Sequence, residues 1–200
     1  MTTTDATRAS FTIDLLEWAP WLERVTETDL APGQRAEVEA YVAAQQNSDY
    51  IDVLANDYVA LRARALVHRH VYTSTDPSPS ANRELAATAA SRVTGCVFCA
   101  SVHARMYAGF SRNRELALRV LADGVAADLP PLERAVVDLS AKLTTDPEAL
   151  TAADLAPLRE QGLDDLAILD VINYAAFFAN ANRLMLSLGE PKRPAARPAS

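Results

Sequence analysis

The chain has 200 residues, half of them hydrophobic, with a formal net charge of −7. This length and hydrophobic content predict one globular domain with extensions. The negative charge opposes binding to phosphate backbones and anionic lipid, so we expect no nucleic-acid and no membrane partner. No apolar run is long enough to span a bilayer, and the first ten residues lack the pattern of a signal peptide. We therefore expect a cytoplasmic protein.

Apolar residues recur at helical spacing along almost the whole chain, and we find no strand-like alternation of useful length. The first element is an apolar arm over residues 11–25, which carries Trp18 and Trp21 and is broken at Pro20. Helices are then predicted over residues 33–46, 49–72, 81–94, 96–107, 113–123, 131–144, 152–161 and 164–188. The last helix is apolar on most sides, which is typical of a central or subunit-buried helix. The predicted fold class is all-α.

A loop rich in serine and proline, over residues 73–80, divides the chain. We expect residues 1–75 to form an N-terminal helical extension, whose arm packs onto another subunit. Residues 76–190 are expected to form the main helical domain. Residues 191–200 are rich in proline and basic, which predicts a disordered tail.

The only two cysteines are Cys96 and Cys99, three positions apart. A secreted disulfide scaffold would need more cysteines at wider spacing. At about 100° per residue, Cys96, Cys99 and His103 share one face of a helix that starts near Cys96. Amide groups at a helix start stabilise a thiolate, and His103 is placed to accept a proton from Cys99. The spacing therefore predicts a redox-active dithiol.

Glu84 precedes Cys96 by twelve residues. On one straight helix it would lie about 18 Å from Cys96 along the axis and could not reach the thiols. A break at Gly95 lets two helices fold back on each other, which would bring the carboxylate near the cysteines. Glu84 is then a candidate base or proton relay, although an acidic residue in the first turn of a helix is also common for dipole reasons alone.

This pattern of Glu84, eleven residues, Cys96-Val-Phe-Cys99, three residues and His103 resembles the signature of the alkylhydroperoxidase D (AhpD)-like family in the carboxymuconolactone decarboxylase superfamily. The flanking segment RELAATAASRVTGCVFCASVHARMYAG is also similar to that family, and LDVINYAAFFANANRLMLSLGEP resembles its last helix. The resemblance is best over residues 80–190.

The resemblance implies an AhpD-like helical bundle that assembles into homo-oligomers, as trimers, hexamers or dimers. It implies a thiol-dependent peroxidase that reduces alkyl hydroperoxides or related substrates with catalytic residues Cys99, Cys96, His103 and Glu84. The second cysteine attacks the peroxide in the characterised peroxidase, which assigns attack to Cys99 and resolution to Cys96. An external dithiol, thioredoxin-like or lipoyl-like, would reduce the resulting disulfide. No cofactor or metal is implied.

One position departs from the family pattern, because Phe98 stands where the characterised peroxidase has a histidine of its proton relay. This departure bears on peroxidase turnover and leaves the dithiol chemistry intact. The alternatives are a non-enzymatic redox sensor or relay, a decarboxylase-like member of the superfamily, and a zinc site that adds His68 or His70 to the cysteines. Two inert, buried cysteines are the remaining interpretation.

Overall fold

The computed structural model describes residues 10–26, 28–45, 48–73 and 80–194. Over these ranges the chain is mainly helical, which confirms the predicted all-α class. The α-helices are α1 (Pro32–Gln45), α2 (Ser48–Leu54), α3 (Tyr58–Thr73), α4 (Ser80–Thr94), α5 (Val97–Ser111), α6 (Arg114–Asp123), α7 (Pro131–Thr145), α8 (Ala156–Glu160) and α9 (Asp165–Leu188). The remaining elements are β1 (Glu17–Pro20), β2 (Gly189–Lys192) and the 3-10 helices η1 (Ala55–Asp57), η2 (Gly124–Ala126), η3 (Pro147–Ala149) and η4 (Ala152–Leu155).

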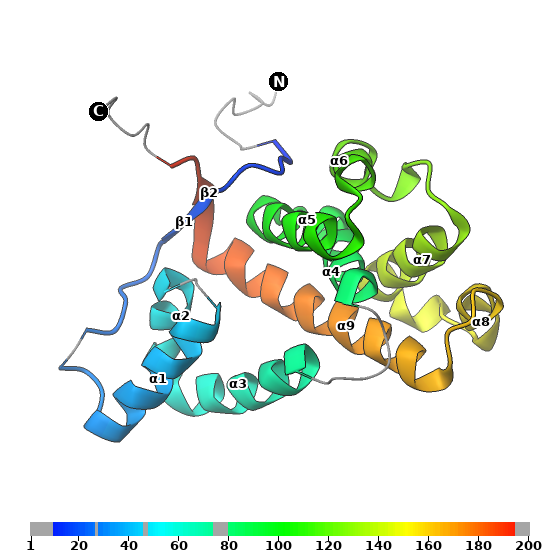
Figure 1. Cartoon of the computed structure of the whole chain (residues 1–200). Helices are drawn as coiled ribbons and strands as arrows, with labels where there is room; N and C mark the ends of the chain where they lie inside the picture. Colours follow the sequence, from blue (N-terminus) through cyan, green and yellow to red (C-terminus); the bar gives the residue numbers. More distant parts are fainter. Residues whose placement is uncertain (1–9, 27, 46–47, 74–79, 195–200) are drawn as a thin grey trace.

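The long helix α9 runs across the molecule and is the element around which the others pack (Figure 1). It contacts α3, α4 and α7, and its inward face is buried at Ile168, Val171 and Ala175. Its start is fixed by the Asp164 side chain, which accepts a hydrogen bond of 2.8 Å from the amide of Ala167. The apolar character of this helix on most sides is thus explained by its central position. None of the described helices has the length and apolarity needed to cross a membrane.

Helices α4 and α5 form an antiparallel pair joined by a tight turn at Gly95. Gly95 has a φ of +82°, in the left-handed region, and the amide of Cys96 donates a 3.0 Å hydrogen bond to the carbonyl of Ser91. This bond closes the end of α4 in the way that a glycine-terminated helix requires. The predicted break at Gly95 is therefore confirmed, and it turns α5 back along α4.

Two short strands were not predicted. β1 pairs antiparallel with β2, with Pro20 opposite Gly189 and Glu17 opposite Lys192. The strand β1 belongs to the apolar arm. The strand β2 includes Pro191 and Lys192, so the prediction of a disordered tail was wrong for these two residues. Residues 195–200 of the predicted tail lie outside the described part of the chain.

The arm also packs within its own chain. Trp18 is buried, its indole N–H donates to the Met185 carbonyl at 3.3 Å, and its ring meets that of Tyr50 edge-on at 5.6 Å. Trp21 is 60% exposed. For Trp18, the expectation of packing onto another subunit is corrected, because its partners are supplied by α2 and α9.

Two predicted helices are divided. The helix expected over 49–72 is split by η1, where the Asn56 amide donates to the carbonyls of Val53 and Glu23 at 2.9 Å and so ties the break to the arm. The helix expected over 152–161 is divided into η4 and α8, and Pro157 lies in the first turn of α8. The sequence did not indicate the first division, whereas a proline at position 157 is typical of the second.

Candidate active site

Cys96 and Cys99 lie at the start of α5, as predicted. Cys96 is the residue that caps the helix, Cys99 lies one turn further, and both are free and buried. The Cys99 thiol donates a hydrogen bond to the Cys96 sulfur, which lowers the pKa of Cys96; the amides of Cys99 and Phe98 add to this effect, while burial opposes it. The same hydrogen bond, burial and the charge on Cys96 raise the pKa of Cys99 well above its usual value.

The two thiols of the pair therefore differ in their pKa values. The shared hydrogen bond favours the charge on Cys96 and the proton on Cys99. This ionisation pattern is opposite to the one expected if His103 simply deprotonated Cys99 in the resting state. The Cys99 sulfur also lies 3.3 Å from the Met185 thioether sulfur, so α9 contacts the pair.

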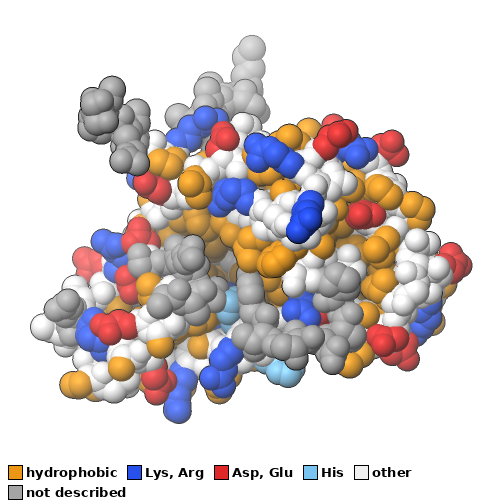
Figure 2. Space-filling view, in the orientation of Figure 1, with side chains coloured by type: hydrophobic (Ala, Val, Ile, Leu, Met, Phe, Trp, Pro, Cys, Tyr) orange, Lys and Arg blue, Asp and Glu red, His pale blue; other side chains and the backbone are white. Residues whose placement is uncertain are grey.

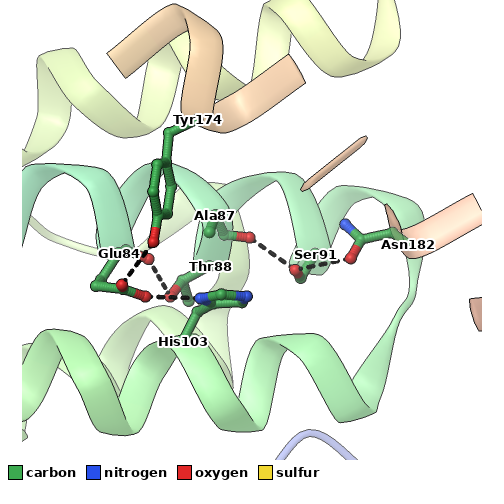
Figure 3. Close-up of polar contacts among 7 residues, drawn as sticks. All are labelled: Glu84, Ala87, Thr88, Ser91, His103, Tyr174 and Asn182. Atoms are coloured by element: carbon green, nitrogen blue, oxygen red, sulfur yellow. Dashed lines mark hydrogen bonds and ion pairs between the residues drawn. The ribbon is translucent and has the colours of Figure 1, made fainter. Parts of the chain in front are cut away.

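Glu84 and His103 meet across the α4–α5 pair. The break at Gly95 was expected to bring Glu84 to the cysteines, whereas the partners of its carboxylate are His103 and Tyr174. The Glu84 Oε2 to His103 Nδ1 distance is 2.6 Å, and the Tyr174 hydroxyl of α9 donates to Glu84 Oε1 at 2.7 Å (Figure 3). All three side chains are buried. Both oxygens of this carboxylate thus have a partner, which is what a carboxylate away from solvent requires.

This network fixes the tautomer of His103. An ionised carboxylate can only accept hydrogen bonds, so the Nδ1 that faces Glu84 carries the hydrogen. The other ring nitrogen, Nε2, points away from Glu84 and is the basic one (Figure 3). The ring itself packs edge-on against Phe178, with centroids 3.9 Å apart. His103 is therefore held in one orientation by Glu84 and Phe178.

The two cysteines open onto different cavities. Cys99 and His103 line a cavity of about 460 Å³, which also receives side chains from α2 and α3. Cys96 lines a second cavity of about 510 Å³, bounded by Trp18, Gly189 and neighbouring residues. Phe98 and Met185 line both. The dithiol thus lies in the wall between two spaces, with one sulfur facing each.

Of the residues proposed for a zinc site, His68 lines the Cys99 cavity, whereas His70 is exposed. Burial, together with the charges of Arg64 and His103, lowers the pKa of His68 to about 3, so this imidazole is neutral at pH 7. Within the described ranges no group of three or more His, Cys, Asp or Glu residues is arranged to hold a metal ion.

Sequence reasoning missed Tyr174 and Met185, both of which come from α9. They lie on one helical face together with Phe178, at spacings of four and seven residues. That spacing was a usable signal, but the many apolar residues of α9 concealed which of its faces meets α4 and α5. Arg64 and Tyr50, which line the Cys99 cavity, were also missed because they belong to the N-terminal helices.

Comparisons with known proteins bear on the family and the fold. Residues 60–137 match the model of the carboxymuconolactone decarboxylase family. No curated protein matches the chain. Two solved structures are similar. One is an AhpD core, an uncharacterized peroxidase-related protein from Ralstonia eutropha JMP134, with a TM-score of 0.73 and 22% identity over 84% of this chain and 88% of that one.

The other is an uncharacterized peroxidase-related protein from Silicibacter sp. TM1040, also with a TM-score of 0.73, at 20% identity over 86% of this chain and 92% of that one. At such identities the structural similarity shows that the fold is shared. The family match starts within α3, so it includes the end of the region expected as an extension, and it continues through the cysteine motif into α7. By this match residues 60–137 are similar to the carboxymuconolactone decarboxylase family, and the chain has the fold of the AhpD core.

Proposed function

We propose that this protein is a thiol-dependent peroxidase, a dithiol–disulfide oxidoreductase that reduces alkyl hydroperoxides through Cys96 and Cys99. The observation that carries the proposal is that Cys99 and an oriented base, His103, line the same cavity, while the second thiol is hydrogen-bonded to Cys99. A pair of inert buried cysteines would need neither the base nor the Glu84 and Tyr174 bonds that orient it.

The first half-reaction uses Cys99. His103 Nε2 accepts the Cys99 proton, and the thiolate attacks the terminal oxygen of the hydroperoxide. The O–O bond breaks, Cys99 becomes a sulfenic acid, and the departing alkoxide takes the proton from His103 to form the alcohol. Glu84 stabilises the imidazolium that exists between these two proton transfers.

The second half-reaction uses Cys96. Its thiolate, which the lowered pKa of Cys96 favours, attacks the Cys99 sulfur and displaces hydroxide, which leaves as water once protonated. The product is the Cys96–Cys99 disulfide. An external thioredoxin-like or lipoyl-like dithiol then supplies two electrons, and the cavity beside Cys96 gives it a route that does not cross the peroxide cavity.

The test is a peroxide-consumption assay with dithiol donors, combined with trapping of sulfenic acid by dimedone. We expect Cys96→Ser to form sulfenic acid on Cys99 and to stop after one turnover, and Cys99→Ser to form none. Glu84→Gln should lower the rate of sulfenic acid formation by about 10²-fold or more, because the amide no longer imposes the His103 tautomer. Rapid sulfenic acid formation in Cys99→Ser would overturn the assignment of the attacking sulfur.

A redox sensor or relay is the second candidate, and the observation that favours it is Phe98, which places an apolar ring between the two cavities. This candidate predicts a reversible Cys96–Cys99 disulfide in the wild-type protein and no peroxide consumption with any dithiol donor. The same assay therefore separates the two functions.

A further inference from the structure

The lining of the cavity above Cys99 is positively charged, although the chain as a whole is negatively charged. The chain as a whole has a net charge of −7. The described residues that line this cavity nevertheless include two arginines, Arg64 and Arg105, and no aspartate or glutamate. Of the two histidines there, His68 is neutral at pH 7. In Figure 2 histidine surface is visible where the N-terminal helices meet the rest of the chain, between hydrophobic side chains.

Arg105 has a structural task that accounts for its charge. Its Nη1 donates to the carbonyls of Ile13 and Asp14 at 3.2 and 2.8 Å and to the Ser101 hydroxyl at 2.6 Å. These bonds hold the arm onto α5. Arg105 therefore anchors a wall of the cavity, and its donors are directed at the protein.

Arg64 differs from Arg105 in what its donors reach. Nη1 donates to the Asn180 amide oxygen at 3.2 Å, and the guanidinium also hydrogen-bonds the Tyr41 hydroxyl. The guanidinium carbon of Arg64, Cζ, lies 4.4 Å from the centre of the Phe177 ring. Nε is buried without a hydrogen-bond partner, and among the described residues no carboxylate forms an ion pair with Arg64. Arg64 as a whole is half-buried, but a buried N–H without a partner is costly unless an acceptor of a bound molecule joins it.

Tyr50 supplies a second free donor beside Arg64. The Tyr50 side chain is 5% exposed, its hydroxyl has no partner within the described structure, and its ring centre is 5.8 Å from the Arg64 guanidinium carbon. Burial raises the pKa of this phenol, so it keeps its proton and remains a donor. Arg64, Tyr50 and Cys99 all line this cavity, so the two donors and the sulfur border one space.

We propose that the cavity above Cys99 binds a small organic monoanion, with Arg64 and Tyr50 holding its carboxylate and the apolar walls holding its hydrocarbon body. One fixed positive charge and two neighbouring donors match one carboxylate. The volume of about 460 Å³ suits a small molecule. The inference deepens the proposed peroxidase function, on which its reactive part rests: the substrate class is a short-chain hydroperoxy carboxylic acid with its peroxide end at Cys99.

Binding is tested without any reaction. Titration calorimetry compares 4-methylpentanoate with its neutral isostere 4-methylpentanamide. We expect the wild-type protein to bind the carboxylate at least about tenfold more tightly than the amide, the strength of a hydrogen bond to a charged group. Arg64→Gln should abolish this preference, Arg64→Lys should keep part of it, and Tyr50→Phe should weaken carboxylate binding severalfold. Arg62→Gln, which removes an exposed charge from the same helix, should leave it unchanged.

Equal affinity for the two compounds, no binding of the carboxylate at millimolar concentration, or a preference that survives Arg64→Gln would overturn the inference. The comparison in the wild-type protein needs no variant, so it holds even if Arg64→Gln does not fold.

A kinetic arm separates this inference from the proposed function. It compares 4-hydroperoxy-4-methylpentanoate with its methyl ester, and we expect kcat/KM to favour the acid at least about tenfold. If neither peroxide is consumed while the carboxylate still binds selectively through Arg64, the peroxidase proposal fails and the binding site stands. If both peroxides are consumed equally and binding is not selective, the peroxidase proposal stands and the anion site fails.

Discussion

Cys96 and Cys99 are chemically identical side chains whose pKa values are shifted in opposite directions by one shared hydrogen bond. The donor, Cys99, lowers the pKa of Cys96, and the charged acceptor helps to raise that of Cys99. This division suits a peroxidatic and a resolving sulfur. In the proposed mechanism, Cys99 stays protonated until His103 removes its proton, and Cys96 attacks when the sulfenic acid forms.

The sign of this coupling is testable at the level of one atom. Cys99→Ala removes the donor that is the largest cause of the lowered pKa of Cys96, so the pKa of Cys96 should rise and thiolate formation should require higher pH. Cys99→Ser keeps a hydroxyl donor and serves as the matched control. Thiolate absorbance at 240 nm, followed against pH, measures both. Identical titration curves for the two variants would contradict the role given to the Cys99 donor.

At the scale of elements, the turn at Gly95 determines whether the site exists, because only the reversal between α4 and α5 brings Glu84 to His103. A Cβ at Gly95 would meet no atom within 4 Å, so the cost of Gly95→Ala comes from its φ of +82° alone. We expect a loss of about 1 kcal/mol in the free energy of unfolding, measured by urea denaturation.

The control for this substitution is Gly109→Ala in α5. Gly109 is helical and also has open space around the added Cβ, so this change should raise the free energy of unfolding by about 0.5–1 kcal/mol. Equal effects of the two alanines would mean that the left-handed turn is not what limits the stability of the pair.

The elements that sequence reasoning predicted correctly are those defined by local patterns. Helical spacing, a break at a glycine and a capping pair such as Thr151 and Asp154 depend on neighbours within a few residues, and the structure has all three. The strands β1 and β2 were missed because each has four residues, each contains a proline, and their pairing joins Glu17 to Lys192. No local pattern encodes such a contact.

The same distinction applies to the site. Cys96, Cys99 and His103 share one helix, so their spacing alone predicted that they lie on one face. Glu84 required the turn at Gly95 and the family resemblance. Tyr174 reaches the site only because α9 packs on α4, and this long-range packing is not written in the residues around it.

At the scale of the whole molecule, the N-terminal elements complete the site. Tyr50 comes from α2 and Arg64 from α3, and both line the Cys99 cavity, whereas Trp18 of β1 lines the Cys96 cavity. The region expected as an extension therefore forms part of both cavities. We propose that this region sets the choice of substrate, while α4, α5 and α9 supply the chemistry.

Assembly into a homo-oligomer is the last proposal, and the exposed end of the arm is its candidate contact. Trp21 and Leu22 are 60% and 56% exposed at the end of β1, although Trp18 is buried within its own chain. Burying both side chains against a second subunit would contribute roughly 3 kcal/mol or more. The double variant Trp21→Ser, Leu22→Ser should therefore weaken association at least tenfold.

Light scattering across a dilution series measures this effect, and Leu118→Ser is the control, because Leu118 is 42% exposed on α6, outside the N-terminal region. A wild-type protein that is monomeric at high concentration would make the oligomer prediction wrong. An oligomer whose mass and dissociation constant are the same in the double variant would place the interface elsewhere. Trp18, which lines the Cys96 cavity, is unchanged in this variant. Any loss of association can therefore be assigned to the exposed end of the arm.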